Sequence, residues 1–532
     1  MGKGTFITKR KTDNPRRTTI TMESYYFTEE HKLFRQGLRD FLDREVMPHI
    51  DEWEEQERVP KEIWRKFGEM GYLGLIYPEE YGGIEADFFF SVVFIEEISK
   101  CFSGGFAITP SVHQYMSNTY IYKHGSETLK QKYLPSAVNG EKIACIGITE
   151  PGAGSDVANI QTKAVKDGDY YIVNGAKTFI SNAYYGDYVI AVVKTDPEAG
   201  VGGISLLVID LDAEGISKRK LKKLGWHASD TAELNFDDVK VPVENLIGVE
   251  GEGFYYLMGG LQLERLVGAI GAVASAEHAL SYALDYMNQR EAFGRKINRF
   301  QVLRHRVAEL SSELTAQKYF TYHCCRLQND NHYAVKECSM AKLNTSELNY
   351  KVMYECLQFF GGYGYIEDFK IARLLRDSRI LTIGGGSSEV MKEILAKMII
   401  DDKVYQEADG IHFPSQKINE TELEKEIVTE NLTEMSIEKT TQVLQEKASN
   451  AAPLGNSMKF VFGDEGNIYL DGYADNTVSN EDKEADCIVN VTREDFDALL
   501  SGELNPMNAF MAGKLKISGD MSVAMKLNTI MG

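Results

Sequence analysis

At 532 residues and a formal net charge of −21, the chain is too long for one hydrophobic core and too acidic for a typical nucleic-acid-binding surface. Hydrophobic residues make up 43% of it, which is typical of globular proteins and excludes a disordered chain. The composition therefore predicts roughly three or four folded domains.

The seven cysteines show no paired spacing of the kind that binds metal ions, and Cys324 and Cys325 are adjacent in a helical pattern. We expect buried free thiols and no metal site, in a compartment that keeps thiols reduced. No stretch of about 18 apolar residues is evident, so we expect no transmembrane segment. A bacterial-type cytoplasmic protein fits these features, and the mitochondrial matrix is the alternative.

Residues 1–23 are predicted to form a basic arm. Its positive charges are Lys3, Lys9, Arg10, Lys11, Arg16 and Arg17. The arm lacks the apolar segment of a secretory signal. A frayed basic arm is the preferred interpretation, and a transit peptide remains the alternative.

Residues 24–145 are predicted to form a helical domain, because apolar residues recur at three- and four-residue steps, as in Glu30 to Val46. The pattern changes near Ile146. Residues 146–253 contain short β-rich runs separated by turn signals such as Asn174-Gly175. We expect a central antiparallel β-barrel here, with a sandwich as the alternative.

The helical period returns over residues 254–404, where we expect a four-helix-bundle domain. One apolar stripe consists of Leu266, Ile270, Val273, Leu280, Leu284 and Met287. Residues 405–422 are polar and aperiodic, which predicts a linker. Residues 423–532 combine an acidic helix candidate, alternating strands and a helix start at Thr492, so we expect a separate small α+β domain.

One loop, GITEPGAGSDVA from Gly147 to Ala158, is unusually rich in glycine. Glycine lets the backbone approach a ligand closely, and Pro151 restricts the conformations open to the loop. The hydroxyls of Thr149 and Ser155 can therefore be aimed at one ligand. Taken alone, the loop is equally well interpreted as a surface turn.

Four further strings accompany this loop. They are KTFISN from Lys177, REAFGRKINRFQ from Arg290, QFFGGYGY from Gln358, and RDSRILTIGGGSSEVM from Arg376. In order and separation, the five strings resemble the acyl-CoA dehydrogenase family from about Tyr26 to Asp402. The resemblance implies an oxidoreductase that binds FAD and an acyl-CoA, passes electrons to an electron-transfer flavoprotein, and forms a homotetramer or related oligomer.

The resemblance also implies roles for residues of the β domain. Ile148 and Thr149 would hydrogen-bond the pyrimidine end of the flavin, and Ser155 would contact cofactor and substrate. Phe179 would pack on the flavin ring and Ser181 would lie near its N-5. Many relatives have Trp and Thr at these last two positions, but Phe keeps an aromatic face and Ser keeps a hydroxyl donor.

A second set of residues is implied to reach the FAD of a neighbouring subunit. Its members are Arg290, Phe293, Gln301, Gln358, Gly361 and Gly362. Arginine offers phosphate a charge and a fork of donors. Without the motif, Arg290 would be interpreted as a solvated charge at a helix end. Ser387 and Glu389 are expected beside the cofactor.

The general base is expected at an unusual position. Many family members carry the catalytic Glu within the string aligned with IGGGSSEV, but this chain has Gly385 there. Glu389 is four residues further on and a poor substitute. In the long-chain and isovaleryl branches the Glu instead lies in a string like LQLERLV, where this chain has Glu264. A lone Glu near the start of a helix is more often there because it interacts favourably with the helix dipole. Because this chain has glycine at 385, a catalytic role for Glu264 becomes the preferred interpretation.

The predicted mechanism assigns three roles. Glu264 removes the α-proton, the Gly385 N–H polarises the thioester carbonyl, and FAD takes the β-hydride to give a trans-2-enoyl-CoA. Arg265 is expected to support the substrate or CoA rather than perform chemistry.

The segment Ala485 to Leu527 closely resembles the sterol carrier protein, or nonspecific lipid-transfer, domain. Such domains bind acyl chains or sterols in a hydrophobic tunnel. The candidate lining residues are Phe496, Leu499, Leu500, Phe510, Met511, Met521 and Met525, which could equally form an ordinary core. An acyl-CoA oxidase and a catalytically idle lipid-binding scaffold remain the alternative functions.

Overall fold

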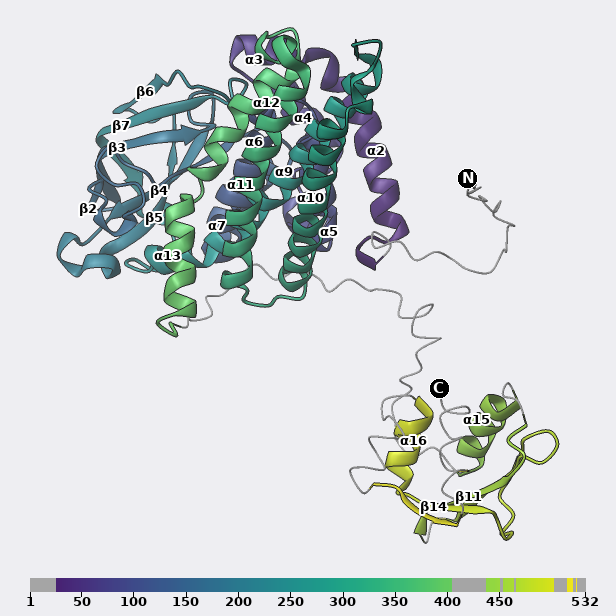
Figure 1. Cartoon of the computed structure of the whole chain (residues 1–532). Coiled ribbons are helices and arrows are strands. Elements are labelled where there is room, and N and C mark those ends of the chain that lie inside the picture. Colours follow the sequence, from purple (N-terminus) through teal and green to yellow (C-terminus); the bar gives the residue numbers. More distant parts are fainter. Residues whose placement is uncertain are drawn as a thin grey trace. The chain divides into compact units, whose positions relative to one another are not determined.

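The computed structural model describes residues 25–403, 437–449, 453–463, 466–501, 514–519 and 523 (Figure 1). The chain divides into two compact units, Met1–Gln416 and Lys417–Gly532, which are described separately. The predicted basic arm and the predicted linker lie outside the described residues.

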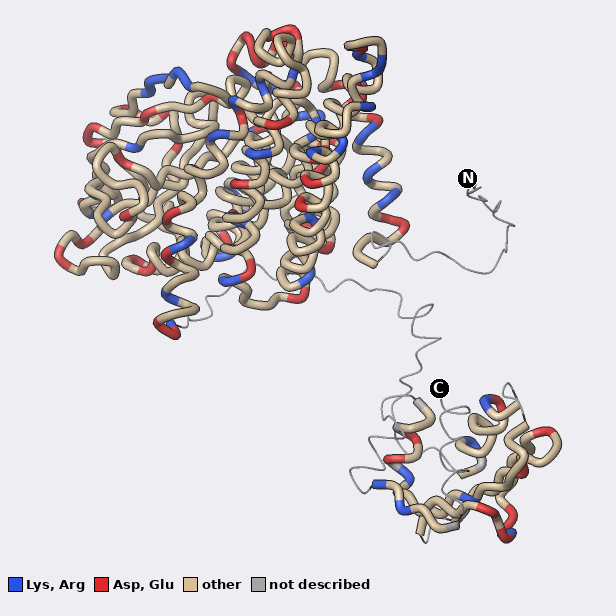
Figure 2. The backbone as a smooth tube through the Cα atoms, viewed as in Figure 1, with Lys and Arg blue, Asp and Glu red and all other residues tan. Residues whose placement is uncertain are grey.

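The described part of the first unit begins with a layer of seven helices, four of which begin at a residue whose side chain caps the helix. The helices are α2 (Glu29–Glu45), α3 (Ile50–Gln56), α4 (Lys61–Glu69), α5 (Phe88–Ile98), α6 (Gly104–Ser111), α7 (Asn118–His124) and α8 (Glu127–Val138). Thr28 caps α2, whose acidic first turn and basic last turn complement the helix dipole (Figure 2). The run FFFSVVFIEEI makes α5 buried almost throughout. A π-helical segment, Val112–Ser117, joins α6 to α7.

The middle of the unit is an eight-stranded mixed sheet. Its strands are β1 (Ala144–Gly147), β2 (Lys163–Asp167), β3 (Tyr170–Ser181), β4 (Tyr188–Lys194), β5 (Ile204–Asp210), β6 (Ile216–Lys220), β7 (Thr231–Pro242) and β8 (Leu246–Ile247). The order is β6-β7-β3-β2-β4-β5-β8, with β1 paired to β4. The pairs β1·β4 and β2·β4 are parallel. The expected antiparallel barrel is therefore not confirmed, because the described strands form an open order and two of the pairings are parallel.

Strand β4 shows why this sheet needs cover on both faces. Tyr188, Ile190 and Val192 join the core shared with the helices, while Val189 and Ala191 join a second core within the β domain. Alternate side chains point to opposite faces, so this apolar run is buried on both.

The turn expected at Asn174-Gly175 is wrong. Strand β3 continues through it, and the pairing with β7 shifts register between Val173 and Gly175. Gly175 has φ +146 and its absent Cβ would lie 2.6 Å from Thr162 Oγ1. The glycine thus supplies a bulge and a close approach rather than a hairpin.

The helical bundle follows. It contains α9 (Gly253–Gln289), α10 (Gln301–Asn329), α11 (Val335–Phe360), α12 (Lys370–Ser378) and α13 (Ser388–Ile399), which pack beside one another in Figure 1. Contrary to expectation, α9 is long and apolar enough to cross a membrane by length and composition alone. However, 67% of its most apolar 18-residue window is buried inside the structure, as in the core helix of a bundle.

The described residues of the second unit form a five-stranded sheet and two helices. The elements are α15 (Ile437–Ser449), β11 (Ser457–Val461), β12 (Asn467–Asp471), β13 (Thr477–Ser479), β14 (Cys487–Asn490), α16 (Arg493–Ser501) and β15 (Lys516–Gly519), with strand order β13-β12-β11-β14-β15. The helix start at Thr492 is confirmed, since its Oγ1 accepts the Asp495 N–H at 3.2 Å. The structure therefore confirms the expected α+β architecture.

The described side chains of the second unit form one apolar core. Phe496, Leu499 and Leu500, expected to line a lipid tunnel, are buried in it. Phe510, Met511, Met521 and Met525 lie outside the described residues. All seven cysteines of the chain are free and buried.

Candidate active site

Glu264 lies on α9 and is held by a tyrosine from α7. The Tyr120 hydroxyl donates to Glu264 Oε1 at 2.7 Å, and Tyr120 is only 2% exposed. Gly260, one helical turn before Glu264, makes room for this phenol, because a Cβ there would stand 2.3 Å from Tyr120 Oη. Tyr120 was not predicted from the sequence, although a glycine inside an apolar helix is a signal of close approach.

Burial raises the pKa of Glu264 to about 7, although the Tyr120 hydrogen bond and the Arg265 charge both lower it. The low-dielectric surroundings disfavour the carboxylate, whereas the phenol and the guanidinium stabilise it. A carboxyl group with this pKa is half ionised near neutral pH. Glu264 is thus suited to exchange a proton with a bound ligand.

Two buried cations connect Glu264 with the glycine loop 384–386, because the charge of Arg265 acts both on Glu264 and on Lys342. Arg265 is 8% exposed and its Nη1 donates to Ser339 Oγ at 3.4 Å. Lys342, on α11, is 4% exposed and its ammonium donates to the Gly386 carbonyl. Burial and the nearby Arg265 charge lower the pKa of Lys342 to about 8. Together they place positive charge beside Glu264 and the glycine loop.

The glycine loop 384–386 leads into α13 and is fixed from α11. Lys342 holds the Gly386 carbonyl, and the Ser388 hydroxyl donates to Glu347 Oε1 at 2.6 Å. Gly385 has φ +65, and nothing lies within 4 Å of where its Cβ would be. The backbone at Gly385 is therefore open on the side where other residues would carry a side chain.

The residues around this loop have mixed positions. Ser387 caps α13 by accepting the Val390 N–H at 3.3 Å. Glu389 is exposed in the first turn of α13, where its own backbone N–H and Ser387 lower its pKa. An exposed acid with a lowered pKa is a poor general base, which agrees with the choice of Glu264 over Glu389.

The glycine-rich loop after β1 is held by a buried ion pair that was not predicted from the sequence. Lys177 is fully buried and donates to Glu150 Oε1 at 2.7 Å and to the Ile148 carbonyl at 3.1 Å. Glu150 also accepts the Gln161 and Thr162 N–H groups. Burial lowers the pKa of Lys177 to about 8. Both partners occur inside the diagnostic strings, but their pairing depends on the folded loop.

The predicted flavin contacts of the β domain surround this loop. The Thr149 carbonyl accepts the Thr178 N–H at 2.8 Å, which joins the loop to β3. Phe179 lies at an irregularity of β3 with φ +62 and is 70% exposed. Ser181 is partly buried at the end of β3, and Ser155 is exposed. A bulky aromatic residue at positive φ is a strained arrangement, which presents an uncovered aromatic side chain.

The second predicted set of flavin contacts gathers at the other end of α9. The Arg290 guanidinium lies 5.6 Å from the centre of the Tyr363 ring, so the strings from Arg290 and Gln358 meet in space. Phe293 is 95% exposed with φ +52. Gly361 has φ +59, and neither it nor Gly362 has any atom within 4 Å of an added Cβ. Gln301 and Gln358 are exposed.

The residues present fit a flavin dinucleotide, but in two groups. Uncovered aromatic side chains, open glycines and an arginine suit a ring system and a phosphate. Arg290 follows Glu264 by 26 positions, which is about 39 Å along a helix. Within one chain the Arg290 group is therefore remote from Glu264.

Models of four families match the chain. They are the acyl-CoA dehydrogenase N-terminal domain at residues 28–141, the middle domain at 145–239, the C-terminal domain at 251–400, and the SCP-2 sterol transfer family at 438–532.

Individual relatives agree with these models. The long-chain specific acyl-CoA dehydrogenase of Sus scrofa mitochondria is 40% identical over 71% of this chain and 88% of its own length. A crystal structure of an acyl-CoA dehydrogenase from Geobacillus kaustophilus is 46% identical and has a TM-score of 0.69, covering 70% of this chain and 99% of its own. A structure titled as an electron transferring flavoprotein of Acidaminococcus fermentans is 36% identical with a TM-score of 0.68, covering 70% and 98%.

Proposed function

Since the chain belongs to the acyl-CoA dehydrogenase family, we propose that Glu264 is the base that starts the α,β-dehydrogenation of an acyl-CoA thioester. The protein is an FAD-dependent acyl-CoA dehydrogenase with a fused SCP-2 domain. The observation that carries the assignment is the half-buried Glu264, with a pKa near 7 and a tyrosine hydrogen bond.

The α-proton of a thioester is weakly acidic, so its removal needs a carboxylate whose pKa lies near the working pH. Glu264 in its ionised form accepts this proton at Oε1 or Oε2. Tyr120 remains a donor throughout, because burial holds the pKa of its phenol well above the usual value. The tyrosine therefore fixes the orientation of the carboxylate while leaving one oxygen available for the substrate.

Loss of the α-proton places negative charge on the thioester oxygen, and the chain must stabilise it. We assign this role to the Gly385 N–H, whose surroundings are open and whose loop Lys342 and the Ser388–Glu347 contact fix. The charges of Arg265 and Lys342 add a favourable field. When bound, FAD supplies the acceptor for the hydride that leaves Cβ.

Ile148, Thr149, Ser155, Phe179 and Ser181 would hold the flavin end of the cofactor. The second group would hold the pyrophosphate and adenine of the FAD in a neighbouring subunit. The members of this second group are Arg290, Phe293, Gln301, Gln358, Gly361 and Gly362. Ser387 and Glu389 would complete the surroundings of the cofactor. The length of α9 between Glu264 and Arg290 supports this division. The active assembly would then be a homo-oligomer, with a tetramer as the specific proposal.

Electrons pass from the reduced enzyme to an electron-transfer flavoprotein. The SCP-2 domain would bind fatty acyl chains and raise the local concentration of substrate at the dehydrogenase unit. We also propose that the protein is located in the cytoplasm.

The experiment that tests the assignment measures flavin bleaching by acyl-CoA without oxygen. Glu264→Gln keeps the size of the side chain but cannot accept the proton, so the bleaching rate should fall by about 100- to 10,000-fold. Glu389→Gln is the matched control and should stay within a few-fold of the wild type. Loss of bleaching in the control, with a normal rate in Glu264→Gln, would place the base on α13 instead.

A further inference from the structure

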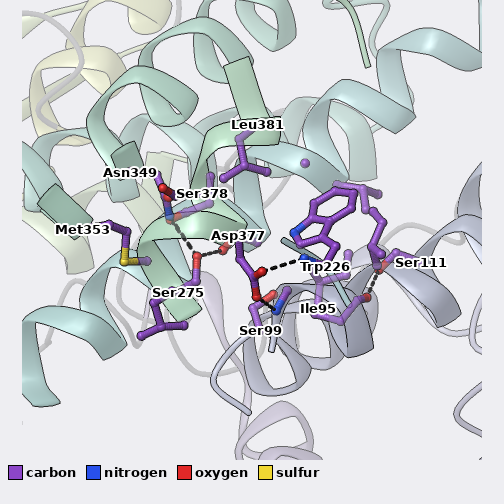
Figure 3. A pocket seen from close by; sticks show the side chains of 18 residues that line it. Ile95, Ser99, Ser111, Trp226, Ser275, Asn349, Met353, Asp377, Ser378 and Leu381 are labelled. Atoms are coloured by element: carbon purple, nitrogen blue, oxygen red, sulfur yellow. Dashed lines mark hydrogen bonds between the residues drawn. The ribbon is translucent and has the colours of Figure 1, made fainter. Parts of the chain in front are cut away.

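A buried carboxylate on α12 joins the helical bundle to both other domains of the first unit. Asp377 is 5% exposed, and its carboxylate points toward Trp226 (Figure 3). Its Oδ2 accepts the Gly104 N–H at 2.9 Å, and its Oδ1 accepts the Trp226 N–H at 2.6 Å. Gly104 is the first residue of α6, and Trp226 lies in the loop between β6 and β7. One side chain of the bundle therefore holds the backbone of the helical layer and of the β domain.

The backbone around this carboxylate is tightly packed. A Cβ on Gly225 would stand 2.6 Å from Asp377 Oδ1, and a Cβ on Gly104 would stand 2.4 Å from Trp226 Nε1. Trp226 has φ +54, a left-handed conformation that is strained for a bulky residue. Such strain persists only where the surroundings determine the backbone conformation. The contact with Asp377 thus helps to fix the shape of this loop.

Asp377 is costly to bury at this place. Burial and the nearby Glu54 carboxylate raise the pKa of Asp377 to about 7, whereas the Trp226 and Gly104 N–H groups lower it. The two N–H groups favour the ionised form, because a carboxylate offers an acceptor oxygen to each of them. Glu54 accepts the Ala228 N–H of the same loop at 3.4 Å. Two buried acids at a strained loop indicate a positional role rather than simple packing.

The Trp226 loop leads directly into the strand pair that is proposed to hold the flavin. Strand β7 begins at Thr231, five positions after Trp226, and Thr231 pairs with Ser181 at the end of β3. Ser181 and Phe179 are two of the proposed flavin contacts. Through the Trp226 N–H, Asp377 therefore holds the segment that enters the flavin-binding end of β3.

The chain leads in the other direction from Asp377 to the glycine loop. Helix α12 ends at Ser378, and Gly385 follows Asp377 by eight positions. Lys342 holds the far side of this segment through the Gly386 carbonyl. The segment that carries the Gly385 N–H is thus anchored at both ends, to the β domain through Asp377 and to α11 through Lys342.

The proposed reaction needs these two parts of the site in register. The hydride leaves Cβ toward the flavin, while the Gly385 N–H would stabilise charge on the thioester oxygen of the same short fragment. A misplacement of about 1 Å between reacting groups can cost about 100-fold in rate. The contact that sets the separation of β3 and the glycine loop should therefore affect catalysis.

We propose that Asp377 is a positioning residue of the dehydrogenase. By joining α12 to the loop before β7, it keeps the Gly385 N–H in register with the flavin-binding end of β3. The carbonyl of a bound acyl-CoA is then polarised where its Cβ meets the flavin. The inference rests on the proposed function, because it assumes that the Gly385 N–H meets the thioester oxygen. Asp377 acts through the backbone, since both of its oxygens accept N–H groups of the chain.

The first test measures steady-state kinetics of Asp377→Asn in the FAD-loaded full chain. Asparagine has the same size, but its amide has one acceptor oxygen and would turn a second donor toward one of the two N–H groups. One of the two attachments is therefore lost. We expect kcat to fall about 10- to 100-fold with a smaller change in KM, because the lost alignment matters most in the transition state.

The second test uses a ligand that cannot be dehydrogenated. In 3-thiaoctanoyl-CoA and 3-thiadodecanoyl-CoA, sulfur replaces Cβ, so the α-proton can leave but no hydride can. The resulting enolate gives a long-wavelength charge-transfer band when its carbonyl is polarised and it lies against the oxidised flavin. Asp377→Asn should lose most of this band per bound flavin. A merely structural role would lower stability and FAD content without changing the band per bound flavin, and that result would overturn the proposal.

Asp187→Asn is the matched control. Asp187 also links the helical layer to the β domain, since it lies 2.8 Å from Lys61 Nζ and accepts the Ile143 N–H at 2.8 Å. It has no connection to the glycine loop through these contacts, so Asp187→Asn should keep the band and kcat. An equal loss of the band in Asp187→Asn would overturn the specific role of Asp377.

Gly225→Ala is a second perturbation of the same contact. It keeps the carboxylate but places a methyl group 2.6 Å from Asp377 Oδ1, so it should weaken the band in the same direction. This variant decides the proposal if Asp377→Asn does not fold, and an unchanged band would then refute it.

The two proposals can fail separately. Absence of both flavin bleaching and the charge-transfer band in the wild type, with every acyl-CoA and both thia ligands, would refute the proposed function. A wild-type band that Asp377→Asn retains in full would refute only the positioning role of Asp377.

Discussion

The hydrogen bond from Tyr120 to Glu264 yields a sharp kinetic prediction. Tyr120→Phe removes the hydroxyl and keeps the ring, so the carboxylate loses its neutral donor at 2.7 Å. A hydrogen bond to a charged group contributes about 1.5–3 kcal/mol, and one pKa unit corresponds to about 1.4 kcal/mol. The pKa of Glu264, about 7 in the wild type, should therefore rise by about one to two units.

The consequence depends on pH. At pH 7 the ionised fraction of Glu264 falls from about one half to about 1–10%, so kcat/KM should drop roughly 5- to 50-fold. Above the new pKa most of the rate should return. Gly260→Ala should shift the profile in the same direction, because its methyl group would stand 2.3 Å from Tyr120 Oη and displace the phenol.

The assay is the pH dependence of kcat/KM for one acyl-CoA, which reports ionisations of the free enzyme. The charge of Arg265 acts on Glu264, and Lys342, which is close to Arg265 and has a pKa of about 8, can shape the alkaline limb. Tyr122→Phe, on the same helix, is the control and should leave the profile in place. An unchanged acidic limb in Tyr120→Phe, or a uniform loss of rate at all pH values, would show that Tyr120 does not tune the base.

Three further outcomes are expected. Glu264→Gln should be more stable than the wild type above pH 7, by on the order of 2–3 kcal/mol in the free energy of unfolding, and should lose this advantage below about pH 4.5. The folded pKa lies above the unfolded value, so the native state loses stability as pH rises between them, and chemical denaturation at both pH values checks this. Lys177→Met should destabilise the dehydrogenase unit by about 3–5 kcal/mol and reduce FAD content, since it leaves Glu150 buried without its cation; denaturation and the flavin spectrum report both. A chain ending at Asp402 should show a higher KM for long acyl-CoA and an unchanged KM for short ones if the SCP-2 domain concentrates substrate, as steady-state kinetics will show.

Each outcome has a clear contrary result. Equal stability of Glu264→Gln and wild type at pH 8 would mean that burial of the carboxylate carries no cost. Full FAD content in Lys177→Met would show that the Lys177–Glu150 ion pair is not needed for FAD binding. An unchanged KM for all chain lengths after truncation would remove the proposed coupling between the two units.

Much of the site was predictable because it resides in short strings. The loop from Gly147, the string around Glu264 and the glycine at 385 each carry their meaning within about a dozen residues. Helices were predictable for a similar reason, since their apolar period and their caps are local, as at Thr492. Strand pairing was not, because Asn174-Gly175 serves equally as a turn or as a bulge until β7 is placed beside it.

The sequence by itself determined the family and the cofactor and predicted Glu264 as the base, since these inferences depend on residue types in a local order. Only the tertiary structure decided what tunes that base and what fixes the glycine loop. Tyr120 meets Glu264 across 144 positions, and Lys342 meets Gly386 across 44. Such contacts depend on how α7, α9 and α11 pack against one another, which no local string of residues specifies.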